Sequence, residues 1–157
     1  MLAKLQRQEG DIASGRADGP EALMETARTC MDFSYYQLAQ DARREECLAR
    51  AEELLEKVTA GPDPDPEAWI LLGRAALFRY DGRRAMECFN AFLRHNPDSG
   101  RGMLWRAEAA YLMGDFARVR ADCAAALTRG DVSDAMLSSA RFWVGEEAEA
   151  VPAGGVS

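Results

Sequence analysis

Two neighbouring stretches between residues 66 and 97 repeat apolar residues every three or four positions, the spacing of one face of a helix. The apolar positions are Trp69, Leu72, Gly73 and Ala76 in the first stretch and Ala85, Phe89, Phe92 and Leu93 in the second. Asp65-Pro66-Glu67 starts the first helix with a capping side chain, a proline that needs no N–H there, and an acid at the positive end of the helix dipole. Asp81-Gly82 separates the stretches and Asn96-Pro97 ends the second. The pattern predicts a helical hairpin.

The hairpin at residues 66–97 is similar to a known repeat. The spacing of Trp69, Leu72-Gly73, Ala85, Phe89 and Pro97 resembles a tetratricopeptide repeat (TPR), a helix-turn-helix unit of about 34 residues. Two positions depart from the family pattern. Ala76 stands where the pattern prefers tyrosine, and Tyr80 stands where such repeats often turn on glycine.

Shifting the frame by one repeat length brings a second segment into register from Gly100 onward. Its matching positions are Ala107, Ala110, Gly114-Asp115-Phe116 and Ala126-Leu127. A further shift reaches Ser133-Asp134, where a single helix begins that resembles the helix capping the end of such arrays. Agreement over three segments favours a helical solenoid, because the small residues at helix contacts recur in register.

The N-terminal part predicts a more divergent hairpin over residues 19–60. The inward-facing positions expected for its first helix are Leu23, Ala27, Cys30, Met31, Tyr35 and Leu38, and those for its second helix are Cys47, Ala51, Leu54, Leu55 and Val58. The second helix also carries the opposite-charge pairs Glu46–Arg50 and Glu53–Lys57 at i,i+4, which indicate a solvated outer face. Residues 1–18 are polar and weakly periodic, and are expected to form a flexible arm or a frayed helix.

The resemblance implies an all-α fold, a TPR-like α-α superhelix of about seven antiparallel helices in a right-handed solenoid. One domain is expected over residues 19–150. It comprises a divergent hairpin at 19–60, repeats at 66–99 and 100–131, and a capping helix at 133–149. Residues 151–157 are expected to form a disordered tail.

Composition narrows the function classes. The 157 residues carry a net charge of −7 with a pI near 4.8, which argues against nucleic-acid binding because phosphates need a basic face. No apolar run approaches the roughly 18 residues that a membrane span needs, and residues 1–19 lack a secretory signal pattern, so no membrane insertion and a cytoplasmic location are expected. The abundance of Ala, Arg and Gly hints at a GC-rich bacterial source. Four scattered cysteines, Cys30, Cys47, Cys88 and Cys123, are expected in the interior.

No motif in the sequence points to catalysis, a metal or a cofactor. The chain has no glycine-rich phosphate loop, no GxSxG and no HExxH. Its single histidine, His95, ends a helix and is expected on the surface, and widely spaced cysteines do not form a metal site. The sequence therefore predicts a protein that is not an enzyme and that needs no cofactor.

In TPR arrays, as the resemblance implies, partners dock on the concave face lined by the first helix of each repeat. Carried onto this chain, that face comprises Glu67, Ile70, Arg74, Leu77, Phe78, Arg101, Leu104, Glu108, Tyr111 and Leu112. This set predicts an apolar floor bordered by Arg and Glu, suited to an extended peptide or a helix. The alternative is that Leu77, Leu112 and Tyr111 pack between repeats. The carboxylate clamp of chaperone-binding TPR proteins is absent from the matching positions.

Trp105 and Phe142 leave a second alternative open. An exposed pair of aromatic residues would indicate a partner or dimer surface, whereas burial between repeats would make both residues structural.

These patterns favour a non-enzymatic TPR adaptor or assembly protein that binds a peptide or helix of a partner protein. A chaperone similar to those of type III secretion, holding a hydrophobic client, is the first alternative. A self-associating scaffold, such as a homodimer joined through the hairpin at 20–60 or the final helix, is the second.

Overall fold

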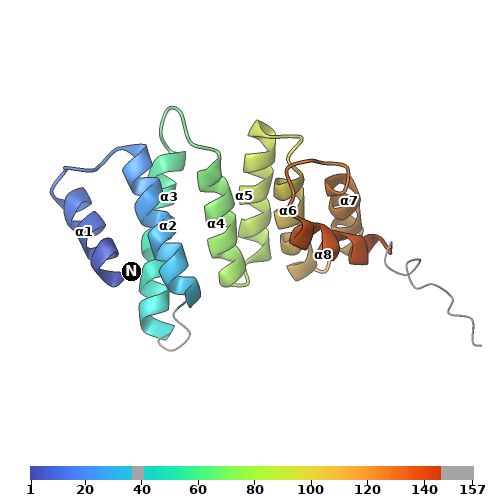
Figure 1. Cartoon of the computed structure of the whole chain (residues 1–157), viewed down its shortest axis with the longest axis horizontal. Helices are drawn as coiled ribbons and strands as arrows, with labels where there is room; N and C mark the ends of the chain where they lie inside the picture. The colour runs from blue at the N-terminus through green and yellow to red at the C-terminus, as the bar shows by residue number, and fades with distance from the viewer. Residues whose placement is uncertain (37–40, 146–157) are drawn as a thin grey trace, which may run out of the picture. The chain divides into compact units, whose positions relative to one another are not determined.

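A computed structural model describes residues 1–36 and 41–145, and within these residues the fold is all-α, with eight helices and no strand (Figure 1). The helices are α1 (Leu2–Ala13), α2 (Pro20–Tyr36), α3 (Asp41–Thr59), α4 (Glu67–Phe78), α5 (Gly82–His95), α6 (Gly100–Leu112), α7 (Phe116–Ala126) and α8 (Asp134–Val144). They form two compact units, an N-terminal unit of residues 1–79 and a C-terminal unit that begins at Tyr80. The two helices of the hairpin expected at 66–97 therefore fall in different units.

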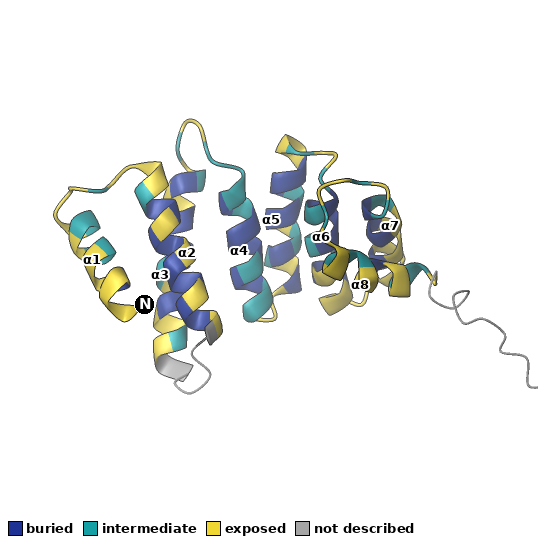
Figure 2. Cartoon of the chain, viewed as in Figure 1, coloured by how far each residue is buried: buried dark blue, intermediate teal, exposed yellow. Residues whose placement is uncertain are grey.

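The core of the N-terminal unit lies where α2, α3 and α4 pack together (Figure 2). The expected inward-facing residues that are buried are Leu23, Ala27, Cys30 and Met31 on α2 and Cys47, Ala51, Leu54, Leu55 and Val58 on α3. Tyr35 was expected to face inward, but its residue surface is 60% exposed and its ring lies 6.1 Å from that of Phe78. Leu38 lies outside the described residues.

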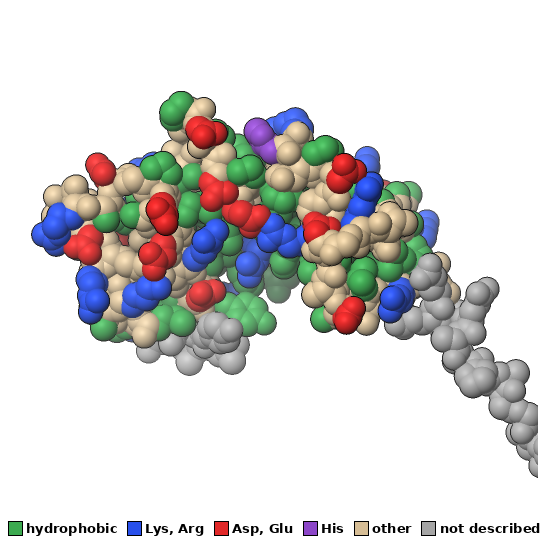
Figure 3. Space-filling model, turned by 45° about the horizontal axis from the view of Figure 1, so that its top comes forward, with side chains coloured by type: hydrophobic (Ala, Val, Ile, Leu, Met, Phe, Trp, Pro, Cys, Tyr) green, Lys and Arg blue, Asp and Glu red, His purple; other side chains and the backbone are tan. Residues whose placement is uncertain are grey.

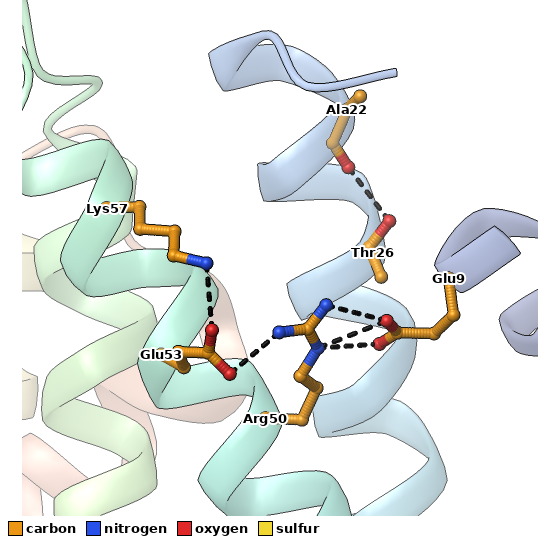
Figure 4. A network of polar contacts seen from close by, with 6 residues as sticks. All are labelled: Glu9, Ala22, Thr26, Arg50, Glu53 and Lys57. Carbon is orange, nitrogen blue, oxygen red and sulfur yellow. Dashed lines mark hydrogen bonds and ion pairs between the residues drawn. The ribbon is translucent and has the colours of Figure 1, made fainter. Parts of the chain in front are cut away.

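Residues 2–13 form helix α1. The sequence predicts a flexible arm or a frayed helix for this segment. Leu5 is buried, and α1 packs against α2. The Glu9 carboxylate accepts hydrogen bonds from Arg50 of α3 at 2.7–3.1 Å (Figure 4). This bidentate pair supplies a fixed contact for a helix whose one buried residue is Leu5.

The charged face of α3 is less solvated than the sequence suggests. Arg50 pairs with Glu9 and, at 2.7 Å, with Glu53 instead of the expected Glu46. The expected Glu53–Lys57 pair is present at 2.8 Å (Figure 4). Glu52 is buried and accepts a hydrogen bond from Arg79 at 3.1 Å, so the end of α4 covers part of this face.

In the C-terminal unit α6 packs between α5 and α7, and α7 also packs against α8. The contact between α5 and α6 is close because Gly102 has no side chain: a Cβ there would lie 2.7 Å from the ring of Phe92. Next to this contact the rings of Phe89 and Trp105 stack with centroids 6.2 Å apart. An alanine at position 102 would therefore push the two helices apart.

A half-buried arginine joins three helices of this unit. Arg106 of α6 donates two hydrogen bonds to the Asp122 carboxylate of α7, at 2.8 and 2.7 Å. A third N–H of Arg106 donates to the side-chain oxygen of Asn90 on α5 at 3.0 Å. Asp122 is buried, so the paired guanidinium compensates a charge that would otherwise be costly to keep away from water.

Helix starts and turns recur at the predicted spacing of one repeat. The Asp81 carboxylate accepts from the Arg84 backbone N–H and the Asp115 carboxylate from that of Arg118, both at 3.0 Å. The residue before each cap has a left-handed backbone, with φ 58° at Tyr80 and 73° at Gly114. The turn conformation is thus the same at both sites, although Tyr80 has a Cβ that disfavours it.

The start of α4, the cysteines and His95 can each be compared with the sequence prediction. The Asp65 carboxylate accepts from the Glu67 backbone N–H at 2.9 Å, at the predicted start of α4, but the cap position is Pro66 and not the predicted Asp65. All four cysteines are free and buried, and burial raises the pKa of the Cys30 thiol to about 12. His95 lies on the surface in the last turn of α5 (purple in Figure 3).

Breaking the Arg106–Asp122 pair from one side tests its role. We expect Asp122→Ala to lower the free energy of unfolding by about 3 kcal/mol, because it leaves a half-buried guanidinium without its carboxylate. The double variant R106M/D122L removes both charges and should lose clearly less. Urea unfolding followed by circular dichroism measures both, and equal losses in the two variants would contradict this account.

At the turn, replacing Tyr80 with glycine is expected to stabilise the protein. Tyr80 is 83% exposed, so Tyr80→Gly removes little packing while relieving a left-handed backbone that costs about 1–2 kcal/mol for an L-residue. We expect a higher melting temperature, partly offset by the flexibility of glycine in the unfolded chain. Gly114→Ala at the matching turn should lower it. A lower melting temperature for Tyr80→Gly would contradict the inferred strain.

Candidate protein-binding surface

The residues of the predicted concave face fall on two helices in separate units. On α4, Ile70 is buried in the core, and Glu67, Arg74, Leu77 and Phe78 are half-buried. The Phe78 ring contacts Tyr35, and the Arg44 guanidinium lies 5.7 Å from its centroid. Of this group, Ile70 supports the helix from inside and the other four present part of their surface to solvent.

The α6 residues of the predicted face divide in the same way. Leu104 is buried, and the half-buried Arg101 guanidinium lies 5.7 Å from the centre of the Phe92 ring. Glu108, Tyr111 and Leu112 are exposed along the last turns of the helix. The accessible part of the predicted α6 face therefore lies toward its C-terminal end.

Tyr111 belongs to a larger cluster of aromatic rings, and its members come from α6, α7 and α8. Its ring lies 6.0 Å from that of Phe116 and 5.6 Å from that of Trp143. Trp143 also stacks on Phe116 at 6.2 Å and meets Phe142 edge-on at 5.9 Å. We call these four rings, with the neighbouring Leu112 and Met113, the aromatic surface.

Much of the aromatic surface is accessible. Tyr111 is 53% exposed, Phe116 46% and Phe142 67%, while Trp143 is half-buried beneath them. Leu112 and Met113 are exposed too, and both approach the start of α5 at Gly82. Exposed clusters of large apolar side chains on a folded unit mark interaction surfaces.

The sequence predicts the aromatic surface only in part. Phe142 is exposed, as one alternative supposed, but Trp105 is not its partner because Trp105 stacks on Phe89 inside the unit. Phe116 was treated as a position of the repeat register, and Trp143 was not singled out as a surface residue. The signal for Phe116 was the Asp115 cap before it, which places a large side chain in the first, outward turn of α7.

The loop before α8 is held by a carboxylate that the sequence did not single out. Asp131 accepts from the Ser99 hydroxyl at 2.6 Å and from the Gly100 backbone N–H at 2.8 Å, at the start of α6. Partial burial pushes the pKa of Asp131 up, but these hydrogen bonds outweigh it and leave the pKa below its ordinary value. A Cβ at Gly100 would lie 2.6 Å from Val132, so the loop and helix meet only because this residue is glycine.

Arginines occur on the same two helices, α7 and α8, that carry part of the aromatic surface. Arg118 and Arg120 on α7 and Arg141 on α8 are exposed, and within the described residues none of the three forms an ion pair. Arg120 lies one turn beyond Phe116 on the same face of α7, and Arg141 directly precedes Phe142. These helices therefore combine aromatic rings with positive charge that no acidic side chain of residues 1–36 and 41–145 pairs.

The described part of the chain holds neither a candidate metal site nor a candidate membrane span. No group of three or more His, Cys, Asp or Glu side chains there is arranged to hold a metal ion. None of the helices in those residues is long and apolar enough to cross a membrane. Comparison with known proteins finds no matching family model and no matching curated protein.

The Asp131 contact predicts a pH-dependent stability of the C-terminal unit. We expect Asp131→Ala to lower the free energy of unfolding by about 1–2 kcal/mol, as loss of a helix cap does, and to speed amide exchange in α8. Because the folded pKa is lowered, the contribution is complete at pH 7 and is lost as pH falls below the ordinary value of 3.8.

Chemical denaturation at pH 7 and pH 3, with hydrogen exchange at pH 7, measures both effects. Asp63→Ala, which removes an exposed acid from the loop before α4, serves as the matched control. A destabilisation by Asp131→Ala that is as large at pH 3 as at pH 7 would contradict the role of the ionised carboxylate.

Proposed function

We propose that this protein is a non-enzymatic adaptor or assembly protein that binds a peptide or helix of a partner protein. The proposal includes a TPR-like superhelical arrangement, which the repeated turns support. Asp81 and Asp115 cap successive helices in the same way, and each follows a residue with positive φ. In that arrangement α4 and α6 are the first helices of consecutive repeats, and the accessible residues of α6 in the C-terminal unit form the part of the binding face considered below.

The observation that carries the proposal is the exposure of Tyr111. It is a residue of the predicted binding face, it is half exposed, and contacts with Phe116 and Trp143 hold its ring in place. A rigid aromatic ring at the surface offers large contact area and loses little conformational freedom when a partner binds. Leu112 extends this apolar area, and Glu108 borders it.

The buried members of the predicted face have a supporting role in this proposal. Ile70 and Leu104 pack inside their units, so they hold α4 and α6 in position instead of contacting the partner. A charged residue at either position would disturb the core and would not report on binding. Tests of the function therefore use Tyr111 and other exposed residues.

Selection from a displayed library of random peptides, followed by fluorescence anisotropy with the purified chain, tests this function. We expect selected peptides to bind, and Tyr111→Ser to weaken them about tenfold or more, as loss of an aromatic anchor does. Tyr80→Ser is the matched control, because Tyr80 is also exposed but lies outside the aromatic surface.

Circular dichroism first establishes that both variants keep their helices. Failure to select any peptide above background would contradict the proposed function. Equal weakening by the two tyrosine variants would contradict the position of the site.

A further inference from the structure

The aromatic surface can recognise a partner only through side chains. The described residues form helices and no strand, so this part of the chain offers no strand edge to which an extended peptide could add. The accessible groups are the rings of Tyr111, Phe116 and Phe142 and the side chains of Leu112 and Met113. A helix with an apolar stripe matches such a surface, because its side chains all project from one face.

The exposed face of α7 leaves room for a helix to approach. Ala117, Ala121 and Ala124 lie on it at i, i+4 and i+7, next to Phe116, and all three are exposed. Outward helix faces usually carry long polar side chains, whereas this row is small and apolar. A partner helix that contacts Phe116 can therefore come close to the α7 backbone.

The charges around the surface favour an acidic partner. Arg120 continues the Phe116 face of α7, and Arg118 and Arg141 stand nearby in sequence on α7 and α8. Within the described residues these three arginines make no ion pair. Glutamates or aspartates at the edges of a bound apolar stripe would pair with these arginines.

The net charge of −7 for the whole chain does not oppose this pairing. Residues 80–145 hold nine arginines against eight Asp and Glu residues, so the negative charge lies elsewhere in the sequence. At physiological ionic strength charges are screened over about 8 Å, so the arginines beside the surface decide the local interaction. The same arginines disfavour a second copy of this surface as the occupant, because like charges would meet.

We propose that the aromatic surface binds an amphipathic helix whose apolar stripe is flanked by acidic residues. This inference rests on the proposed adaptor function and specifies the chemistry of the partner. Tyr111, Phe116 and Phe142 contact the apolar stripe, the alanine row of α7 lets the helix lie close, and Arg120 and Arg141 pair with its acids.

A designed peptide tests the proposal on the full chain. It carries leucines at i, i+3, i+4 and i+7 with glutamates on both flanks, and its matched control has lysines in place of the glutamates. We expect the glutamate peptide to bind at least about tenfold more tightly than the lysine peptide in 0.15 M salt, measured by fluorescence anisotropy. Phe142→Ser, at an exposed position, should weaken binding about tenfold or more.

Charge reversal separates local from general electrostatics. R120E/R141E should weaken the glutamate peptide about tenfold or more, whereas R83E/R94E should change it by less than about twofold. All four residues are exposed, and both double variants change the net charge equally. Equal effects of the two variants, or equal binding of the two peptides, would overturn the proposal.

Other occupants of the surface give different results. A dimer in sedimentation that Phe142→Ser converts to a monomer would assign the surface to a second copy and overturn the proposal. Peptide binding that appears only in E146Q/E147Q/E149Q would assign it to the chain's own acidic segment and also overturn it. If the glutamate peptide fails while library peptides still bind in a Tyr111-dependent way, the partner chemistry is wrong and the adaptor function stands.

Discussion

The C-terminal unit depends on the ion pair between Arg106 and Asp122. A buried carboxylate is tolerated only with a well-aligned partner, and the guanidinium supplies two parallel hydrogen bonds at 2.8 and 2.7 Å. Its remaining contact to Asn90 brings in α5, so one side chain fixes three helices in a single register. Apolar packing alone would tolerate small sliding between helices that are rich in alanine. The directional ion pair does not tolerate such sliding. It thereby sets where the end of α6 and its Tyr111 lie.

From this fixed centre, the two ends of α6 have different roles. At the first end, Gly100 and the Asp131 carboxylate hold the loop that leads into α8. At the other end, the Gly114 turn reverses the chain, and Tyr111 and Phe116 come into contact across that turn. Trp143 of α8 then packs against both rings and leaves Phe142 exposed. The aromatic surface is consequently built on helices that are held at several points, which suits a preorganised binding surface better than a loop would.

The parts of this structure that the sequence predicted are those set by local chemistry. The turns at Asp81-Gly82 and Gly114-Asp115 and the buried stripe of α3 follow from short-range preferences and from helical periodicity, which a single sequence contains. The Glu9–Arg50 and Ser99–Asp131 contacts join residues far apart in sequence, and no local pattern indicates them. Local sequence patterns were equally insufficient for predicting the binding surface. The resemblance to TPR repeats assigned Ile70 and Leu104 to the predicted binding face, but only packing shows that they are buried.

The most direct test of the aromatic surface is photo-crosslinking at its most exposed ring. A benzophenone amino acid in place of Phe142 is irradiated in a lysate of the source cells, and the crosslinked proteins are identified by mass spectrometry. The same replacement of Tyr80, which is exposed but outside the surface, serves as the control. We expect a discrete adduct at position 142 alone, which an excess of the glutamate-flanked peptide suppresses. Adducts of the same proteins at both positions, or adducts that the peptide leaves unchanged, would contradict it.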